Sequence, residues 1–272
     1  MLTFLTIDKA ESLIFPIRHK ICAEVKSVGG VDVKHIRCIH RRGRIPYEKI
    51  RKLSGKQCTC LLTKEDLVLP EESGLRRFCS GELSERLCLN MATQMLKELQ
   101  KNSDNIKVAV YDPEGSVADG VGVLLKFTKS LTVVTRMTGI YSAEAERILD
   151  ESGAVLKVSK RMKSLENAKL VIAPHKLKTQ LPLSKDSVIL TVSPPAVSQK
   201  GAVYYKYYFT LTDELKNLCP EGYESSYIAS ALYTLLGRFD LGSIVPMATK
   251  GDFGTQTLVS LNKYLINISL NP

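Results

Sequence analysis

Five short apolar runs with intervening segments of helical spacing, between residues 106 and 193, constrain the fold more than any other feature of the chain. The runs are IKVAVY at 106–111, LTVVT at 131–135, AVLKV at 154–158, LVIAP at 170–174 and SVILTV at 187–192. Consecutive apolar positions rich in β-branched residues indicate strands that are covered on both faces, as in a parallel sheet. The alternation of such strands with helices predicts an α/β fold.

Periodicity and punctuation predict further elements around these strands. Apolar residues at helical spacing predict helices over 116–130, 224–239 and 252–266. Ser142 as an N-cap and Gly153 as a C-terminal stop predict a short helix over 143–152. The run AVYYKYYFTL at 202–211 predicts a sixth strand, which we favour over a platform for stacking bases because tyrosine is a common strand residue.

Residues 1–80 show shorter apolar runs in which apolar and polar positions tend to alternate, and this pattern predicts a small strand-rich module. Gly29 and Gly30 lie between two of the runs and predict a hairpin turn. A helix is expected over 81–101, where leucine and methionine recur every four residues. The polar stretch NSDN then breaks the pattern. We therefore expect two domains, 1–102 and 103–272.

Positive charge is concentrated in one part of the chain. The 272 residues include 38 Lys and Arg against 28 Asp and Glu, a formal net charge of +10. The basic cluster, residues 34–56, contains one acid, Glu48, and these cations: Lys34, Arg37, Arg41, Arg42, Arg44, Lys49, Arg51, Lys52 and Lys56. Such a cluster could hold nucleic acid or another acidic partner, or it could be an ordinary solvated hairpin. Because no nucleic-acid module is recognisable, we favour the hairpin.

The apolar runs indicate where in the cell the protein is found, and the cysteines indicate whether it forms disulfides or binds zinc. Because no run of 18 apolar residues and no basic segment before the opening apolar stretch occurs, neither a membrane span nor a secretory signal is expected. The protein is therefore expected in the cytoplasm. Seven cysteines, an odd number without a signal peptide, indicate reduced thiols rather than disulfides. The spacing argues against a zinc site, since no Cys-x-x-Cys pair occurs among the candidate ligands His35, Cys38, His40, Cys58, Cys60 and Cys79.

Four segments together resemble a known group of enzymes. They are TVVTRMT at 132–138, AEAERILDESGAV at 143–155, SLENAKLVIAP at 164–174 and ASALYTLLGRFD at 229–240. Residues 106–193 resemble the nucleotide-binding domain of shikimate dehydrogenase, glutamyl-tRNA reductase and the acyl-carrier-protein reductases, and the last segment is similar to a late helix of the reductase branch. The resemblance implies a Rossmann-like, mostly parallel sheet flanked by helices, after a strand-rich basic N-terminal domain that ends in a helix.

The first strand-to-helix turn departs from the pattern of this group. A dinucleotide fold needs Gly-x-Gly-x-x-Gly there, because the backbone approaches the diphosphate closely. The turn here reads Asp112-Pro113-Glu114-Gly115-Ser116, so two carboxylates stand where the first two glycines belong. Either Gly115 and Ser116 form a shifted phosphate loop with the acids turned aside, or the domain has kept the scaffold and lost the cofactor.

Three positions at the carboxyl ends of strands complete the candidate site. In the family an arginine after the second strand pairs with the 2′-phosphate of NADP, and Arg136 holds that place, so the resemblance implies NADP rather than NAD. His175 follows the fourth strand and Ser193 the fifth, and both should line the crevice in which open α/β sheets bind ligands. Each of the three also fits an ordinary surface position. The candidate cofactor-binding residues are Asp112, Gly115, Ser116, Arg136, His175 and Ser193.

Two functional hypotheses follow from these residues. The first is a Rossmann-like nucleotide or small-molecule binding protein derived from an NADP-dependent oxidoreductase, with or without catalytic activity. The second is a nucleic-acid or acidic-partner binding protein that uses the basic cluster, with Arg41, Arg42 and Arg44 as its main contacts. No catalytic residue carries over from the family, so the reaction, if there is one, stays open.

Overall fold

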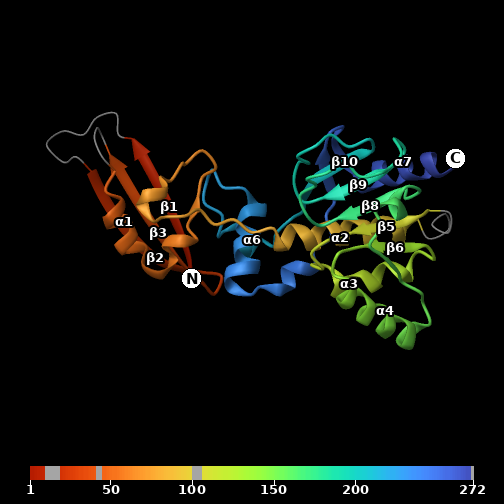
Figure 1. The fold of residues 1–272 in the computed structure, drawn as a ribbon. Helices are drawn as coiled ribbons and strands as arrows, with labels where there is room; N and C mark the ends of the chain where they lie inside the picture. The colour runs from red at the N-terminus through yellow and green to blue at the C-terminus, as the bar shows by residue number, and fades with distance from the viewer. Residues whose placement is uncertain (10–18, 41–44, 100–105, 271–272) are drawn as a thin grey trace. The chain divides into compact units, whose positions relative to one another are not determined.

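The computed structural model describes residues 1–9, 19–40, 45–99 and 106–270, and the chain forms two compact units. The small unit consists of residues 1–80 and 210–239, and the large unit of residues 81–209 and 240–272. Each unit has a sheet of its own (Figure 1). The predicted α/β fold, with a strand-rich N-terminal part and a larger, mostly parallel sheet, is confirmed.

An eight-stranded sheet in the order β12-β11-β10-β9-β8-β5-β6-β7 forms the centre of the large unit. Its strands are β5 (Val108–Tyr111), β6 (Leu131–Val134), β7 (Lys157–Ser159), β8 (Leu170–Ala173), β9 (Val188–Thr191), β10 (Ala202–Tyr208), β11 (Ala248–Gly251) and β12 (Gly254–Thr257). The strands β5 to β10 pair in parallel, whereas β11 and β12 add an antiparallel ribbon. The parallel order β7-β6-β5-β8-β9-β10 is the doubly wound order of the Rossmann fold.

The apolar runs of the sequence become the middle strands of this sheet. All residues of β8 and β9 are buried, as expected for strands that are covered on both faces. The core around them includes Val171, Ile189 and Val203, each with no exposed surface. The predicted strands at 106–111, 131–135, 170–174 and 187–192 are therefore confirmed within one or two residues.

Helices of the large unit are α2 (Glu82–Glu98), α3 (Ala118–Val121), α4 (Thr138–Ser152) and α7 (Leu258–Leu270), with short 3-10 turns η4 (Gly122–Lys126) and η5 (Met162–Leu165). The buried side of α2 packs against β8, β9 and β10. Because of this packing α2 belongs to the large unit, and the chain changes unit after Ser80. This division differs from the expected domains of 1–102 and 103–272.

Three predicted helices differ from those in the structure. The helix over 116–130 is wrong: only α3 and η4 form, because Gly120 and Gly122 weaken a helix at its centre. The start at Ser142 is also wrong, since α4 begins at Thr138, although Gly153 does end it with φ +67°. The helix over 252–266 begins only at Leu258, because the β11–β12 ribbon occupies the preceding residues.

A four-stranded sheet in the order β2-β3-β1-β4 forms the small unit. Its strands are β1 (Leu2–Lys9), β2 (His19–Val28), β3 (Val31–His40) and β4 (Leu62–Thr63). β2 and β3 are an antiparallel hairpin closed by Gly29 and Gly30, both at positive φ, so the predicted turn is confirmed. β1 pairs in parallel with β3 and with β4.

The helices α1 (Tyr47–Ser54), α5 (Asp213–Lys216) and α6 (Ser225–Leu236) complete the small unit, together with the 3-10 turns η1 (Gly55–Thr59) and η2 (Glu71–Ser73); a further turn, η6 (Phe239–Ser243), begins where the small unit ends. The segment before α6 joins β1 through Tyr223, whose ring lies 5.2 Å from that of Phe4 in an edge-to-face contact. The sequence pattern contained no sign of this long-range packing. None of the helices in the described part of the chain has the length and apolar character needed to cross a bilayer.

Candidate functional site

The carboxyl ends of β5 and β8 bring Asp112 and His175 together. From β5 the sheet continues to β6 on one side, and from β8 it continues to β9 on the other. Such a topological switch point is where open α/β sheets bind their ligands. Asp112 comes directly after β5, His175 follows β8 by two residues, and Asp112 Oδ1 lies 2.9 Å from His175 Nε2.

The carboxylate of Asp112 has no exposed surface and holds the turn that follows β5. Its Oδ1 accepts the backbone N–H of Gly115 at 2.8 Å and that of Glu114 at 3.3 Å. Its Oδ2 accepts the backbone N–H of Val117 at 3.0 Å and the hydroxyl of Tyr141 at 2.7 Å. One carboxylate therefore satisfies three backbone donors of the turn and one phenol.

These hydrogen bonds decide the protonation state of Asp112. Burial alone would raise the pKa of Asp112, but the hydrogen bonds from His175, Tyr141 and the backbone of the turn outweigh it and lower the pKa to about 2. Asp112 is therefore ionised at neutral pH and serves as a fixed acceptor rather than as a proton carrier.

His175 is the basic group of the site. The hydrogen bond to Asp112 is the main cause that raises the pKa of His175, and burial opposes it. Nδ1, the other ring nitrogen, lies 3.8 Å from Glu85 Oε1 and 3.8 Å from Glu114 Oε2. The backbone oxygen of His175 accepts the Thr191 hydroxyl at 2.8 Å, which fixes the residue to the end of β9. Both ring nitrogens of His175 are thus faced by carboxylates.

Two members of the site, Glu85 and Tyr141, were absent from the sequence prediction. Burial raises the pKa of Glu85, in the first turn of α2, while His175 and Ser116 oppose that rise. Burial and the charge of Asp112 raise the pKa of Tyr141 far above its usual value, so its phenol stays protonated and donates to Asp112. The sole sequence signal for Glu85 was an acid near the apolar stripe of its helix. We define the switch-point cluster as Glu85, Asp112, Glu114, Tyr141 and His175.

The structure gathers some of the predicted site residues and leaves others apart. Gly115, at φ +81°, lets the turn aim its N–H groups inward, and Ser116 follows it half-buried. Arg136 is exposed after β6, and within the described residues its guanidinium has no hydrogen bond or ion pair. Ser193 is half-buried beyond β9, and its hydroxyl contacts none of the others through a hydrogen bond in the described ranges.

The first turn does not fit a dinucleotide diphosphate. In a glycine-rich loop the backbone N–H groups point at the diphosphate, and a long helix adds its dipole. Here the N–H groups of Glu114, Gly115 and Val117 point at Asp112 instead. The helix after them, α3, has four residues and offers little dipole. The carboxylate of Asp112 therefore accepts the hydrogen bonds that the oxygens of a diphosphate would need.

The basic cluster lies in the small unit, and only part of it can be placed. Arg41, Arg42 and Arg44 lie outside the described residues. Residues 47–54 form α1 rather than one arm of a hairpin. Lys34 Nζ donates to the backbone oxygen of Leu53 at 2.8 Å, and Arg37 pairs with Asp8 at 3.3 Å.

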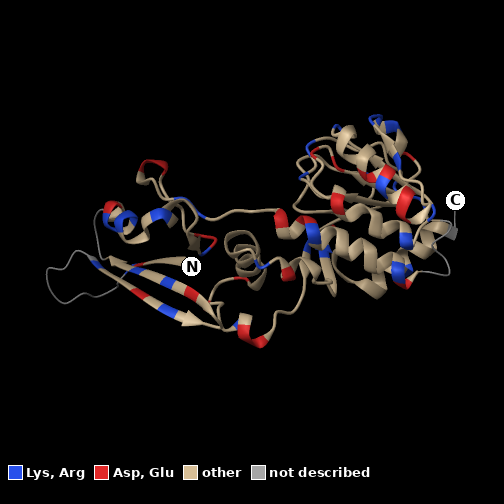
Figure 2. Cartoon of the chain, turned by 90° about the horizontal axis from the view of Figure 1, so that it is seen from below, with Lys and Arg blue, Asp and Glu red and all other residues tan. Residues whose placement is uncertain are grey.

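Acidic residues lie among the basic ones along β2 and β3 (Figure 2). Nucleic-acid or acidic-partner binding through residues 34–56 therefore stays a prediction. No group of three or more His, Cys, Asp or Glu side chains is placed to hold a metal ion, as far as the described residues show.

The raised pKa of His175 predicts a pH dependence of stability. Because the pKa in the folded state lies above the unfolded value of 6.5, the stabilisation is full below pH 6.5 and is lost as the pH rises through the folded pKa. We expect the melting temperature of the large unit to fall as the pH rises above 6.5, and His175→Gln to flatten that fall. Calorimetry at a series of pH values measures the melting temperature of both proteins.

His35→Gln is the matched control for this experiment. Burial lowers the pKa of His35, so its contribution has the opposite sign and lies below pH 6.5. The role given to His175 would be contradicted if His175→Gln left the fall of the melting temperature with pH unchanged. It would also be contradicted if His35→Gln removed that fall.

Comparisons with known proteins give distant structural likenesses. No protein-family model matches the chain, and no curated protein matches it. Quinate dehydrogenase from Corynebacterium glutamicum in complex with NAD is 16% identical, over 39% of this chain and 43% of that chain, with a TM-score of 0.32. This chain thus spans less than half of that enzyme's length.

Two further solved structures are similar at the same level. L-tryptophan dehydrogenase from Nostoc punctiforme is 15% identical, over 87% of this chain and 67% of that chain, with a TM-score of 0.31. A shikimate dehydrogenase in complex with NADP+ is 10% identical, over 88% and 85% of the two chains, with a TM-score of 0.32. The assignment of the fold therefore rests on the strand order and connections of the large unit.

Proposed function

We propose that the chain is a Rossmann-like small-molecule-binding protein, derived from an NADP-dependent oxidoreductase, whose ligand binds at the switch-point cluster without a diphosphate loop. The observation that carries the proposal is the set of hydrogen bonds from Glu114, Gly115 and Val117 to the buried Asp112 carboxylate. The donors that a dinucleotide would need are occupied by the protein itself, whereas the position of the site at the switch point is kept.

The charge of the cluster favours a neutral or cationic ligand. Three carboxylates, those of Glu85, Asp112 and Glu114, surround the ring of His175, the one basic side chain of the cluster. Two like charges about 4 Å apart repel each other by roughly 1 kcal/mol in water and roughly 4 kcal/mol at moderate dielectric. A diphosphate would carry two negative charges into this surrounding, so a ligand without phosphate groups is the better partner.

Apolar surface beside the turn supplies a second kind of contact. Met137 and Ile140, at the start of α4, are 41% and 47% exposed, and both lie about 3.4 Å from the position of a Cβ on Gly115. His175 could donate from Nδ1 to a ligand oxygen, while these side chains cover an apolar part of the same ligand. We assign no catalytic step, and a cytoplasmic location stays a prediction.

An NADP-dependent oxidoreductase is the second candidate, and Arg136 favours it. This side chain is exposed at the end of β6, where an arginine accommodates the 2′-phosphate of NADP in dinucleotide folds. The position of Arg136 fits the nucleotide, but the turn after β5 does not. Binding of NADP would require the turn to give up its hydrogen bonds to Asp112.

A fragment screen followed by NMR tests the first proposal. The chain has four histidines, so the ring signal of His175 can be assigned with single His→Gln variants. We expect neutral and cationic fragments to shift this signal and phosphorylated fragments to leave it unchanged. Tyr141→Phe, which removes one donor to Asp112, should alter the response, whereas Tyr208→Phe, on the exposed end of β10, should not. If no fragment shifts the signal, or if only phosphorylated ones do, the proposal is wrong.

A further inference from the structure

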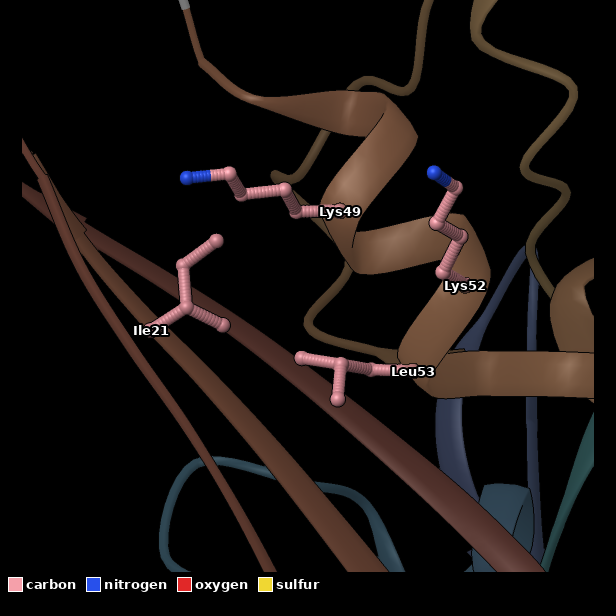
Figure 3. Close-up of a pocket in the computed structure, with 4 residues that line it drawn as sticks. All are labelled: Ile21, Lys49, Lys52 and Leu53. Carbon is pink, nitrogen blue, oxygen red and sulfur yellow. The ribbon is translucent and has the colours of Figure 1, made fainter.

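A pocket in the small unit combines apolar walls with two lysines. It has a volume of about 430 Å³ and lies between β2 and α1, lined by Ile21, Lys49, Lys52 and Leu53. Leu53 points from the helix toward the strands and Ile21 points up from its strand, while Lys49 extends above Ile21 (Figure 3). The two lysines are three residues apart on α1 and so lie on one side of the helix.

The charged residues among the described lining of this pocket are both cations, Lys49 and Lys52. Lys52 is exposed, and among the described residues its ammonium group has no hydrogen bond or ion pair. None of the four described residues that line the pocket is an acid. Arg51 and Lys52 also lie in the last turn of α1. An anion at the mouth of the pocket would therefore meet cationic groups that are held on one short helix.

The apolar side of the pocket continues along β2. Ala23 and Val25 follow Ile21 at every second position and so lie on the same face of the strand. Ala23 is opposite the buried Ile36 in β3, so this is the face that bears the core of the small unit. Val25 is nevertheless 60% exposed. A partly exposed apolar strip about 14 Å long thus runs from Ile21 to Val25, at 3.4 Å per residue, with Lys34 opposite Val25.

We propose that this pocket binds an amphiphilic anion, a carboxylate or phosphate group on an unbranched apolar chain. The head group would lie between Lys49 and Lys52, and the chain would cover Ile21 and Leu53 and extend along β2. Nucleic acid fits this site less well, because its hydrated backbone would leave the apolar walls unused. The proposal concerns the small unit and is independent of the switch-point cluster.

Calorimetric titration of the full chain tests this proposal with matched ligands. Decanoate and decyl phosphate carry the two possible head groups, decyltrimethylammonium has the same chain with a positive charge, and acetate and inorganic phosphate lack the chain. We expect one or both of the decyl anions to bind, the better of them identifying the head group. The cation and the two short anions should bind at least about tenfold more weakly, a difference of about 1.4 kcal/mol.

Variants of two exposed lysines separate the pocket from general charge. Lys52→Glu should weaken the binding of the decyl anion at least about tenfold. Lys56→Glu, an equal charge change in the exposed η1 turn outside the lining residues, should change the affinity less than about twofold. The proposal is overturned if neither decyl anion binds, if the cation binds equally well, or if the two variants weaken binding equally.

Discussion

Asp112→Ala should lower the free energy of unfolding of the large unit by about 3–5 kcal/mol, the typical cost of removing one partner from a buried charged network. The substitution leaves three backbone N–H groups, the Tyr141 hydroxyl and His175 Nε2 without their acceptor. Each buried donor that loses its partner costs about 1–3 kcal/mol. Urea unfolding followed by circular dichroism, with the wild-type chain alongside, measures the loss.

Two further variants show whether the loss comes from the network. Asp119→Ala removes an aspartate from the same region, but Asp119 is exposed and paired with Arg86 at the surface, so we expect a loss below about 1 kcal/mol. Asp112→Asn keeps one acceptor oxygen and should fall between wild type and Asp112→Ala. Equal losses in Asp112→Ala and Asp119→Ala would show that Asp112 does not hold the turn.

The central sheet could be predicted from the sequence because its signal is local. Runs such as LVIAP and SVILTV place consecutive β-branched and apolar residues together, and they become β8 and β9 with every residue buried. The Gly29-Gly30 hairpin has the same local character, since positive φ at both positions suits glycine. Neither element needs information from distant parts of the chain.

Other elements depend on contacts that the sequence pattern does not contain. The helix α4 begins at Thr138 without a side-chain cap, so the usual signal for a helix start was missing there and a better one lay at Ser142. The segment 210–239 joins the small unit through packing such as that of Tyr223 on Phe4, more than 200 residues apart in the chain. Helix α1 contains three of the nine basic residues of the cluster, for which a solvated hairpin was expected.

The candidate site was predicted in part for the same reason. Its position could be derived, since Asp112 and His175 both follow strands whose carboxyl ends meet at one edge. The chemistry of the site could not be derived from the sequence, because Asp112 pairs with residues far along the chain. Tyr141 is 29 positions away and His175 is 63 positions away. The sequence placed two acids in the turn, but only the structure shows that one of them accepts the N–H groups of that turn.

Nicotinamide nucleotides should bind only very weakly to the wild-type chain. The N–H groups of Gly115 and Val117 already donate to Asp112, and Glu114 adds an exposed carboxylate beside the turn. A diphosphate would have to displace a buried carboxylate whose pKa is about 2 and then lie close to its charge. We expect a dissociation constant weaker than about 1 mM, against the micromolar range that would indicate a functional cofactor site, a difference of about 4 kcal/mol.

Calorimetric titration of the wild-type chain with NADPH and NADP+ at neutral pH is the most direct test that the Asp112 carboxylate occupies the diphosphate position. The predicted result is no saturable heat with either nucleotide up to about 1 mM. Micromolar binding of NADPH that Arg136→Ala weakens far more than it weakens NADH would contradict it, and would show that the turn opens to accept a dinucleotide.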